Sequence, residues 1–427
     1  MARAEPFSRF LCPQRKGGVF SLKCSADSSC GLLGPAVAGA ARVRVGLGTA
    51  MCSWTAAWRR ASCSVLRPGE GRPPPGSLSD LLQSSVAGQD TGAEAAAARR
   101  RRPGATSVLL FPGQGSQRVG MGRGLLRSLS ARGLFARARE VLGYDLLSLC
   151  LQGPQTELDR TVHCQPAVFV SSLAAVEKLS HQWPDVIENC VAAAGFSVGE
   201  FAALVFAGAL DFEEALYAVK VRAEAMQQAS EAVPSGMLSI IGQPKSDFKV
   251  ACIEAREHCR SLGVEDPVCE VANYLFPDSR VIAGHLQALK FLEENSRKYY
   301  FARTKMLPVS GAFHTRLMES AIEPLAKVLK SVEIRKPLIN VYSNVDGKKY
   351  IHSKCIKHLL VKQLVSPVKW EQTMHEIYER TKRTEFPFTY EVGPGKQLGT
   401  MLRNCNLKAW RAYKHIEVSE DEEVEEA

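Results

Sequence analysis

A serine in a Gly-Xaa-Ser-Xaa-Gly turn is the residue of this chain best suited to nucleophilic chemistry. The small apolar run 190–194 precedes Gly195-Phe196-Ser197-Val198-Gly199, and a helical pattern over residues 200–206 follows. A buried strand, a sharp glycine-flanked turn and a helix form a nucleophile elbow, which exposes the serine hydroxyl near helix N–H groups. The pattern therefore predicts that Ser197 is a nucleophile whose reaction passes through an oxyanion. A plain strand–helix turn with a capping serine is the alternative.

A second glycine-containing loop follows the apolar run 107–111. Its sequence is Pro112-Gly113-Gln114-Gly115-Ser116-Gln117. The loop lacks the Lys-Ser/Thr of a P-loop and the glycine spacing of a dinucleotide site, which argues against phosphate binding. We expect instead that backbone N–H groups of this loop face Ser197.

Arg222 and His314 are the other candidates for a functional role. Arg222 lies beside the apolar stripe of a helix predicted to begin after a capping Asp211 and to run to about residue 231. A buried arginine needs an anionic partner, although a snorkelling or structurally paired arginine is the alternative. His314 ends the loop Gly311-Ala312-Phe313-His314, just before a helix predicted over residues 315–331. A side chain on such a loop can reach a site, but a surface or capping histidine is the alternative.

The elements that must position these residues predict an α/β fold. We expect an α/β-hydrolase-like core with a parallel sheet, built from residues 105–235 and 310–416. Residues 236–309 have a β-α-β-β-α-β pattern, which is typical of a ferredoxin-like subdomain. Its strands are expected at 237–241, 268–274, 280–283 and 305–309, and its helices at 245–261 and 286–300.

The two ends of the chain differ in composition from the rest. Residues 1–104 hold 15 Lys and Arg against 6 Asp and Glu, and they are rich in Ser, Ala, Gly and Pro. This composition is typical of an organelle transit peptide followed by a linker. Met51 opens a second stretch of this kind and is a candidate start site. The run 99–102 fits a linker or processing site better than a nucleic-acid patch. Residues 417–427 are predicted to form an acidic, disordered tail.

The overall composition limits the class of protein. The net charge of +10 is unevenly placed, with +9 in residues 1–104 and seven acids in the tail, which leaves about +8 for residues 105–416. This basic body suits an acidic partner, with a solvated mixed surface as the alternative. No run of about 18 apolar residues occurs, so we predict no membrane span. The 13 cysteines form no Cys-Xaa-Xaa-Cys pair and no cluster with histidine. This pattern indicates reduced thiols and argues against a metal site or a closed disulfide framework.

Taken together and in order, the motifs resemble those of the malonyl-CoA:acyl carrier protein transacylase family over nearly all of residues 107–415. They are Phe-Pro-Gly-Gln-Gly-Ser-Gln at 111–117, Gly-Phe-Ser-Val-Gly-Glu at 195–200, Val-Arg-Ala-Glu-Ala-Met-Gln at 221–227, Gly-Ala-Phe-His at 311–314, Gln363 before Ser-Pro-Val-Lys-Trp, and Glu-Val-Gly-Pro-Gly at 391–395. With the transit-like leader, the chain is most similar to the mitochondrial members. The resemblance therefore implies a place in the mitochondrial matrix and in type II fatty acid synthesis.

The resemblance implies that malonyl passes from malonyl-CoA to the phosphopantetheine thiol of an acidic acyl carrier protein, without a cofactor or a metal. Ser197 would carry the malonyl group. His314 would act first as general base and then as general acid, oriented by the main-chain carbonyl of Gln363. The backbone N–H groups of Gln114 and Val198 would form the oxyanion hole.

The resemblance also implies a pocket that selects malonyl. Arg222 would bind the free carboxylate in a bidentate pair and disfavour acetyl, which leaves the guanidinium unpaired. Phe196, Phe313 and Asn273 would lie at the pocket. The family usually has His where this chain has Phe196, and a phenylalanine side chain cannot donate a hydrogen bond. The family also often has a second Asn where this chain has Leu275.

Two other classes of function remain open at this point. A serine thioesterase or esterase would need an Asp as third catalytic residue, and the candidate Asp346 has the context of a hairpin turn. A non-catalytic protein that binds a carrier protein or RNA would use the basic surface and would not need Ser197, His314 and Arg222 together. We do not expect nucleic acid to be the partner.

Overall fold

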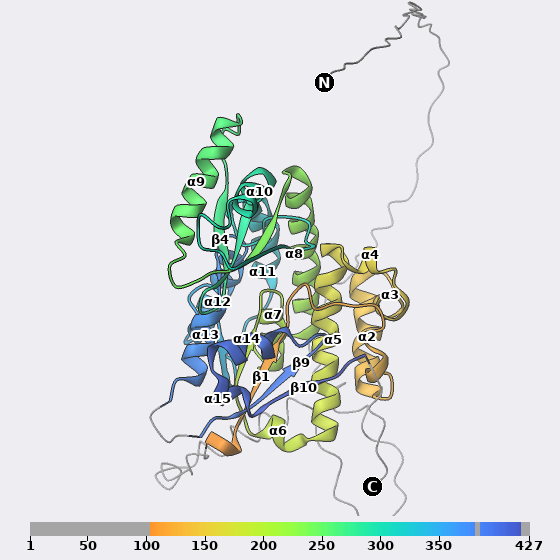
Figure 1. Ribbon diagram of the computed structural model, residues 1–427. Coiled ribbons are helices and arrows are strands. Elements are labelled where there is room, and N and C mark those ends of the chain that lie inside the picture. The colour runs from red at the N-terminus through yellow and green to blue at the C-terminus, as the bar shows by residue number, and fades with distance from the viewer. Residues whose placement is uncertain (1–102, 381–384, 420–427) are drawn as a thin grey trace, which may run out of the picture. The chain divides into compact units, whose positions relative to one another are not determined.

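The computed structural model describes residues 103–380 and 385–419, which are built around a five-stranded sheet (Figure 1). The strands run parallel to one another in the order β10-β9-β1-β2-β7. They are β1 (Ser107–Phe111), β2 (Cys190–Gly195), β7 (Asn340–Tyr342), β9 (Phe388–Val392) and β10 (Tyr413–Ile416). The expected parallel sheet is confirmed, and β2, the strand that ends at the elbow, lies between β1 and β7. Apart from residues 103 and 104, the predicted leader lies outside the described residues.

A second sheet has the strand order β6-β3-β5-β4-β8. Its pairs are antiparallel except for β4 with β8. The strands are β3 (Ser235–Ile241), β4 (Cys269–Phe276), β5 (Ser279–His285), β6 (Arg303–Met306) and β8 (Val368–Lys369). Helices α9 (Phe248–Ser261) and α10 (Leu286–Glu294) pack on it over a core of their own, which includes Leu238, Ile282 and Leu289. The strands and helices predicted between residues 237 and 309 are therefore present, with shifted ends.

The remaining helices join and cover the two sheets. They are α2 (Leu129–Leu142), α3 (Leu146–Gln152), α4 (Gln155–Leu158), α5 (Thr161–Gln182), α6 (Pro184–Glu188), α7 (Gly199–Phe206), α8 (Phe212–Ala232), α11 (Ile322–Ser331), α12 (Ser353–Gln363), α13 (Trp370–Tyr378), α14 (Gln397–Cys405) and α15 (Leu407–Trp410), with 3-10 turns η2 (Pro103–Ala105), η3 (Arg123–Leu125) and η4 (Arg316–Ala321). None of the helices in the described part of the chain is long and apolar enough to cross a bilayer.

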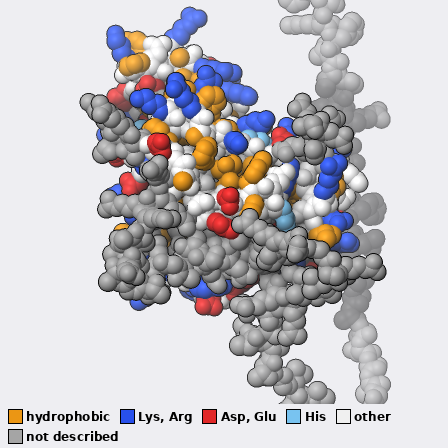
Figure 2. Space-filling view, turned by 90° about the horizontal axis from the view of Figure 1, so that it is seen from below, with side chains coloured by type: hydrophobic (Ala, Val, Ile, Leu, Met, Phe, Trp, Pro, Cys, Tyr) orange, Lys and Arg blue, Asp and Glu red, His pale blue; other side chains and the backbone are white. Residues whose placement is uncertain are grey.

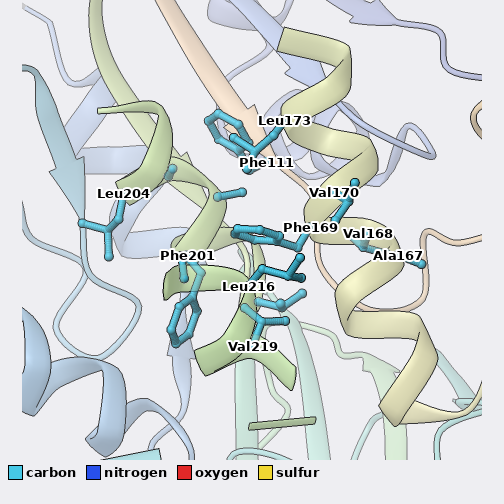
Figure 3. Packing of buried hydrophobic residues seen from close by; sticks show 14 of the residues in the cluster. Phe111, Ala167, Val168, Phe169, Val170, Leu173, Phe201, Leu204, Leu216 and Val219 are labelled. Atoms are coloured by element: carbon cyan, nitrogen blue, oxygen red, sulfur yellow. The ribbon is translucent and has the colours of Figure 1, made fainter. Parts of the chain in front are cut away.

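Both faces of the parallel sheet are buried, because successive side chains of a strand point to opposite faces. Leu109 and Phe111 of β1 belong to one core, and Val108 and Leu110 to another. The first core also contains Phe169, Phe201 and Leu216, which come from α5, α7 and α8 (Figure 3). The second core is covered by α13 and α14, which supply Trp370, Met374, Leu398 and Leu402. The strand that leads into the elbow between β2 and α7 is thus packed against a hydrophobic core on each face of the sheet.

Capping residues set several helix ends. The Asp211 carboxylate accepts a hydrogen bond from the Glu213 N–H at 3.2 Å, which confirms the predicted start of α8. Helix α2 begins at Leu129, because the Ser128 side chain caps it by accepting a hydrogen bond from the Ala131 N–H. The helix expected from residue 315 begins as the 3-10 turn η4, capped by Thr315, and continues as α11.

The prediction of a disordered tail from residue 417 is wrong for its first residues. Val418 is fully buried, and its carbonyl accepts hydrogen bonds from the N–H groups of Gly122 at 2.7 Å and Gly124 at 3.1 Å. Glu417 pairs with Arg118 at 2.9 Å. Burial of the Val418 side chain in the core therefore orders this part of the tail, in spite of the acidic residues around it. Residues 420–427 lie outside the described residues.

The close packing at the elbow predicts that Gly199→Ala destabilises the protein. A Cβ at position 199 would lie 2.3 Å from the Phe111 carbonyl oxygen and 2.6 Å from that of Pro112, which are backbone atoms and cannot move aside. We expect a loss of about 1–3 kcal/mol in the free energy of unfolding, measured by urea denaturation. Gly133→Ala is the control, because Gly133 lies on the exposed face of α2 with no atom within 4 Å of the added Cβ. Equal stability of the two variants would contradict the packing argument.

Candidate active site

The elbow holds Ser197 in a conformation that few non-glycine residues adopt. Its φ angle is 54°, in the left-handed region, at the point where β2 ends and α7 is about to begin. Gly195 and Gly199 allow this bend, since a Cβ on Gly195 would lie 1.9 Å from the backbone of Gly199. The Phe196 N–H donates to the Phe111 carbonyl at 2.9 Å, which ties the turn to β1. The predicted nucleophile elbow is therefore present.

Asn344 holds the elbow from behind. Its Oδ1 accepts a hydrogen bond from the Ser197 N–H at 2.7 Å, and its Nδ2 donates to the Gly195 carbonyl at 2.7 Å. Asn344 follows β7, and the sequence analysis did not single it out. The neighbouring Asp346 is exposed and accepts from the Lys348 N–H, so it has the turn role expected for it.

His314 lies against the Ser197 hydroxyl. The Nε2 of His314 is 3.0 Å from Ser197 Oγ, and its Nδ1 is 2.8 Å from the main-chain carbonyl oxygen of Gln363. Because a carbonyl oxygen only accepts, Nδ1 carries the proton, and Nε2 presents its lone pair to the serine hydroxyl. Burial and the charge of Arg222 lower the pKa of His314 to about 4. The imidazole is therefore neutral at physiological pH and able to accept a proton.

Arg222 extends from α8 into the same cluster and is fully buried. Its Nη1 donates to Gln165 Oε1 at 2.5 Å, and its Nη2 donates to Ser197 Oγ at 3.0 Å and to Gln363 Oε1 at 2.8 Å. All three acceptors are neutral, and Nε has no hydrogen-bond partner among the described residues. Burial lowers the pKa of Arg222 to about 10, while Glu200 opposes the shift. A buried guanidinium without a direct ion pair is suited to bind an anion.

The Gln363 side chain connects the cluster to a buried carboxylate. Only the main-chain carbonyl of Gln363 was expected to matter. Its Nε2 also donates to the Ser197 carbonyl at 3.1 Å and to Glu200 Oε2 at 2.6 Å. Gln165, Glu200 and Asn344 are thus the members of the cluster that sequence reasoning missed. Glu200 was visible only as the residue that follows the elbow motif.

The loop that carries Gln114 contacts the elbow. A Cβ on Gly113, the neighbour of Gln114, would be 2.5 Å from the Phe196 carbonyl oxygen, so the two loops are in close contact. Within residues 103–380 and 385–419, the N–H groups of Gln114 and Val198 have no hydrogen-bond acceptor. The Gln114 side chain contacts Gln165, its Oε1 accepting from Gln165 Nε2 at 3.4 Å. The loop with Gln114 is therefore connected to Arg222 through the side chain of Gln165.

The three residues predicted to line the pocket have different surroundings. Phe196 packs its ring edge-on against Trp370, with ring centroids 5.5 Å apart. Phe313 is buried in the main core, next to His314. Asn273 lies on β4 of the second sheet, and its buried Oδ1 has no partner in the described part of the chain. Their contacts with a substrate remain predictions.

The described residues contain no group of three or more His, Cys, Asp or Glu side chains arranged to hold a metal ion.

Comparison with known proteins places this cluster in a family. Residues 108–388 match the family described as "Acyl transferase domain". The chain is 65% identical over 366 residues to "Malonyl-CoA-acyl carrier protein transacylase, mitochondrial" of Mus musculus, which covers 85% of this chain and 95% of the relative.

Solved structures agree with this placement. An acyl carrier protein S-malonyltransferase from Vibrio cholerae matches with a TM-score of 0.65 and 33% identity, over 73% of this chain and 97% of that one. A malonyl-transacylase in complex with a type II PKS acyl-carrier protein matches with a TM-score of 0.64 and 32% identity, over 73% and 94% of the two chains. The chain that positions Ser197, His314 and Arg222 in this way belongs to the acyl transferase family, among the malonyl-CoA-acyl carrier protein transacylases.

Proposed function

We propose that this chain transfers a malonyl group from malonyl-CoA to the thiol of an acyl carrier protein, by way of an ester on Ser197. The observation that carries the proposal is the buried guanidinium of Arg222, which lies 3.0 Å from the nucleophilic oxygen without a direct ion pair. A carboxylate on the acyl group of the substrate would supply the missing anion. The names of the relatives, which include a mitochondrial transacylase, agree with this substrate and with a mitochondrial location.

The first half-reaction moves the acyl group to the enzyme. Ser197 Oγ attacks the thioester carbonyl, and its proton passes to His314 Nε2. The N–H groups of Gln114 and Val198 would hold the oxyanion of the tetrahedral intermediate. When the C–S bond breaks, the CoA thiolate leaves and takes the proton from Nε2. The products are CoA and malonyl-Ser197.

The second half-reaction reverses these steps with another thiol. The carrier thiol gives its proton to His314 Nε2 and attacks the ester carbonyl, and Ser197 Oγ leaves with that proton. Because two thioesters are similar in energy, the site has to exclude water more than it has to drive the reaction. The buried position of Ser197 and His314 is consistent with this requirement.

A thioesterase or esterase is disfavoured by how His314 is oriented. In such a triad a carboxylate would accept from Nδ1. Here the acceptor is the Gln363 main-chain carbonyl, and Asp346 serves a turn. A neutral acceptor stabilises an imidazolium less than a carboxylate does. Such a dyad lacks the charged partner that a triad provides while its histidine activates water.

The carrier protein is expected to be acidic and to carry phosphopantetheine. On the face seen in Figure 2, Lys and Arg side chains gather in the upper part, while Asp and Glu side chains are scattered. Together with the positive net charge of residues 105–416, such a surface would attract an acidic partner. The complex of a related transacylase with an acyl-carrier protein supports such a protein as the partner.

We also infer that the two sheets correspond to the two parts expected from the sequence. In chain order the second sheet runs β3-α9-β4-β5-α10-β6, with β6 and β5 on either side of β3, which supports a ferredoxin-like subdomain at residues 236–309. The parallel sheet with its elbow supports an α/β-hydrolase-like core in residues 105–235 and 310–416. A transit peptide and linker in residues 1–104, a start at Met51 and a place in the matrix remain predictions.

Isotope-labelled malonyl-CoA provides the direct test of the transfer. We expect label on Ser197, located by peptide mass spectrometry, and its quantitative release to acyl carrier protein added afterwards. Ser197→Ala should carry no label. Label that appears as free malonate in place of malonyl carrier protein would contradict the transfer and favour a thioesterase.

Loss of Arg222 should relax the choice of acyl group. We expect Arg222→Ala to lower kcat/KM for malonyl-CoA by about 100-fold or more, because the substrate carboxylate then stays buried and unpaired. The value for acetyl-CoA should fall far less. Arg137→Ala is the control, since Arg137 pairs with Glu213 away from the site. An unchanged ratio of malonyl to acetyl transfer would remove Arg222 from the pocket.

The titration of His314 should lie well below that of an ordinary histidine. Burial and the Arg222 charge both disfavour the imidazolium, so the pKa falls from 6.5 to about 4. NMR of ring-labelled protein, with His314→Gln to assign the resonance, should show a neutral ring throughout pH 5.5–8. In Arg222→Gln the midpoint should rise, because one of the two causes is gone. A wild-type midpoint near 6.5 would argue against a buried base beside Arg222.

A further inference from the structure

A buried carboxylate lies directly behind the nucleophile, and no step of the reaction described above uses it. Glu200 is the second residue of α7, three positions after Ser197, and none of its surface is exposed. Its Oε1 accepts a hydrogen bond from the Tyr350 hydroxyl. Its Oε2 accepts from the Asn344 N–H at 3.1 Å and from Gln363 Nε2 at 2.6 Å.

Two of these three partners hold the reacting groups in turn. Asn344 accepts from the Ser197 N–H at 2.7 Å. Gln363 accepts from His314 Nδ1 through its main chain at 2.8 Å and from Arg222 Nη2 through its side chain at 2.8 Å. One carboxylate therefore lies one residue away from the nucleophile, the base and the guanidinium.

The carboxylate also determines which way the Gln363 amide faces. Glu200 Oε2 accepts hydrogen bonds from both the Asn344 N–H and Gln363 Nε2, so the amide turns its Nε2 toward Glu200 and its Oε1 toward Arg222. The opposite orientation would place the NH₂ group against the guanidinium, which only donates. The amide thereby connects the buried guanidinium of Arg222 to the buried carboxyl group of Glu200. Burial raises the pKa of Glu200 to about 7, against the opposing effects of its hydrogen bonds and of Arg222.

We propose that Glu200 is a positioning residue of the acyl transfer, which fixes Asn344 behind Ser197 and fixes Gln363 between His314 and Arg222. The proposal rests on the proposed function, because it concerns the same reaction. In this role Glu200 acts through Asn344 and Gln363 and does not itself contact the substrate. If Glu200 has this role, loss of the hydrogen bonds that it accepts should lower the rate of acyl transfer at each correctly folded site.

Glu391 offers a matched control elsewhere in the same molecule. It is fully buried, and burial raises its pKa to about 7 as well. It accepts hydrogen bonds from the Tyr413 hydroxyl and from the N–H groups of Leu398 at 3.1 Å and Gly399 at 2.8 Å. These partners belong to β10 and to the start of α14, and none of them holds Ser197, His314 or Arg222.

The experiment compares Glu200→Met, Glu200→Gln and Glu391→Met in the full chain. Methionine fills the volume and accepts almost no hydrogen bonds. Glutamine keeps one oxygen for Asn344 and Gln363, and its NH₂ group can donate to the Tyr350 oxygen. Each variant is titrated with labelled malonyl-CoA to count the sites that acylate. The kcat per titrated site, the KM for malonyl-CoA and the melting temperature are then measured.

We expect Glu200→Met to lower kcat per titrated site by about 10- to 100-fold, since a displacement of the order of 1 Å in a catalytic group has this effect. Glu200→Gln should stay within about 3-fold of the wild type. Glu391→Met should lower the melting temperature and leave kcat per site unchanged. If Glu200→Met proves too unstable to titrate, Glu200→Asp takes its place, because the shorter side chain draws the carboxylate away from both partners while keeping its charge.

Wild-type kcat per site in Glu200→Met or Glu200→Asp would overturn the inference, as would an equal loss in Glu391→Met. A loss in Glu200→Gln as large as that in Glu200→Met would also overturn it, because hydrogen bonds would then not be what matters. Failure of the proposed function is a separate result, since the wild type itself would then not pass malonyl to the carrier protein.

Discussion

The buried charge of Arg222 is the constraint on which the rest of the site depends. A guanidinium removed from water costs several kcal/mol unless its donors are satisfied and its charge is balanced. Here Nη1 and Nη2 donate to neutral oxygens of Gln165, Ser197 and Gln363, Nε has no partner among the described residues, and the carboxyl group of Glu200 lies one amide further on. The cation is thereby held in place and still able to bind a carboxylate that arrives with a substrate.

The same charge affects the base. Arg222 and burial together keep His314 neutral, and the Gln363 carbonyl leaves the lone pair on the nitrogen that faces Ser197. The elbow presents the serine oxygen to both residues, because its glycines let β1, β2 and α7 come close together. Nucleophile, base and anion-binding group thus come from three separate stretches of the chain, which are held by one connected set of hydrogen bonds.

Much of this arrangement could be predicted from the sequence, for reasons that differ between residues. Ser197 was identified because the elbow is a local motif, in which the backbone strain and its glycines are adjacent. His314 and Arg222 have little local signal, and their roles came from the resemblance of ordered motifs. Asn344, Gln165 and the Gln363 side chain could not be predicted, because their importance lies in contacts between segments more than 50 residues apart. The tail prediction was wrong at Val418, where composition gives no information about a single apolar contact.

The main-chain carbonyl that orients His314 has a consequence for mutational robustness. In a serine triad a single codon change can replace the orienting aspartate and remove its function. Every residue type at position 363 supplies a carbonyl, so no substitution there deletes the acceptor itself. Intolerance of this position in a scan of all substitutions would therefore report on the side-chain amide between Arg222 and Glu200. The side chain at position 363 thus determines how Arg222 and Glu200 are connected, while the fold determines how the base is oriented.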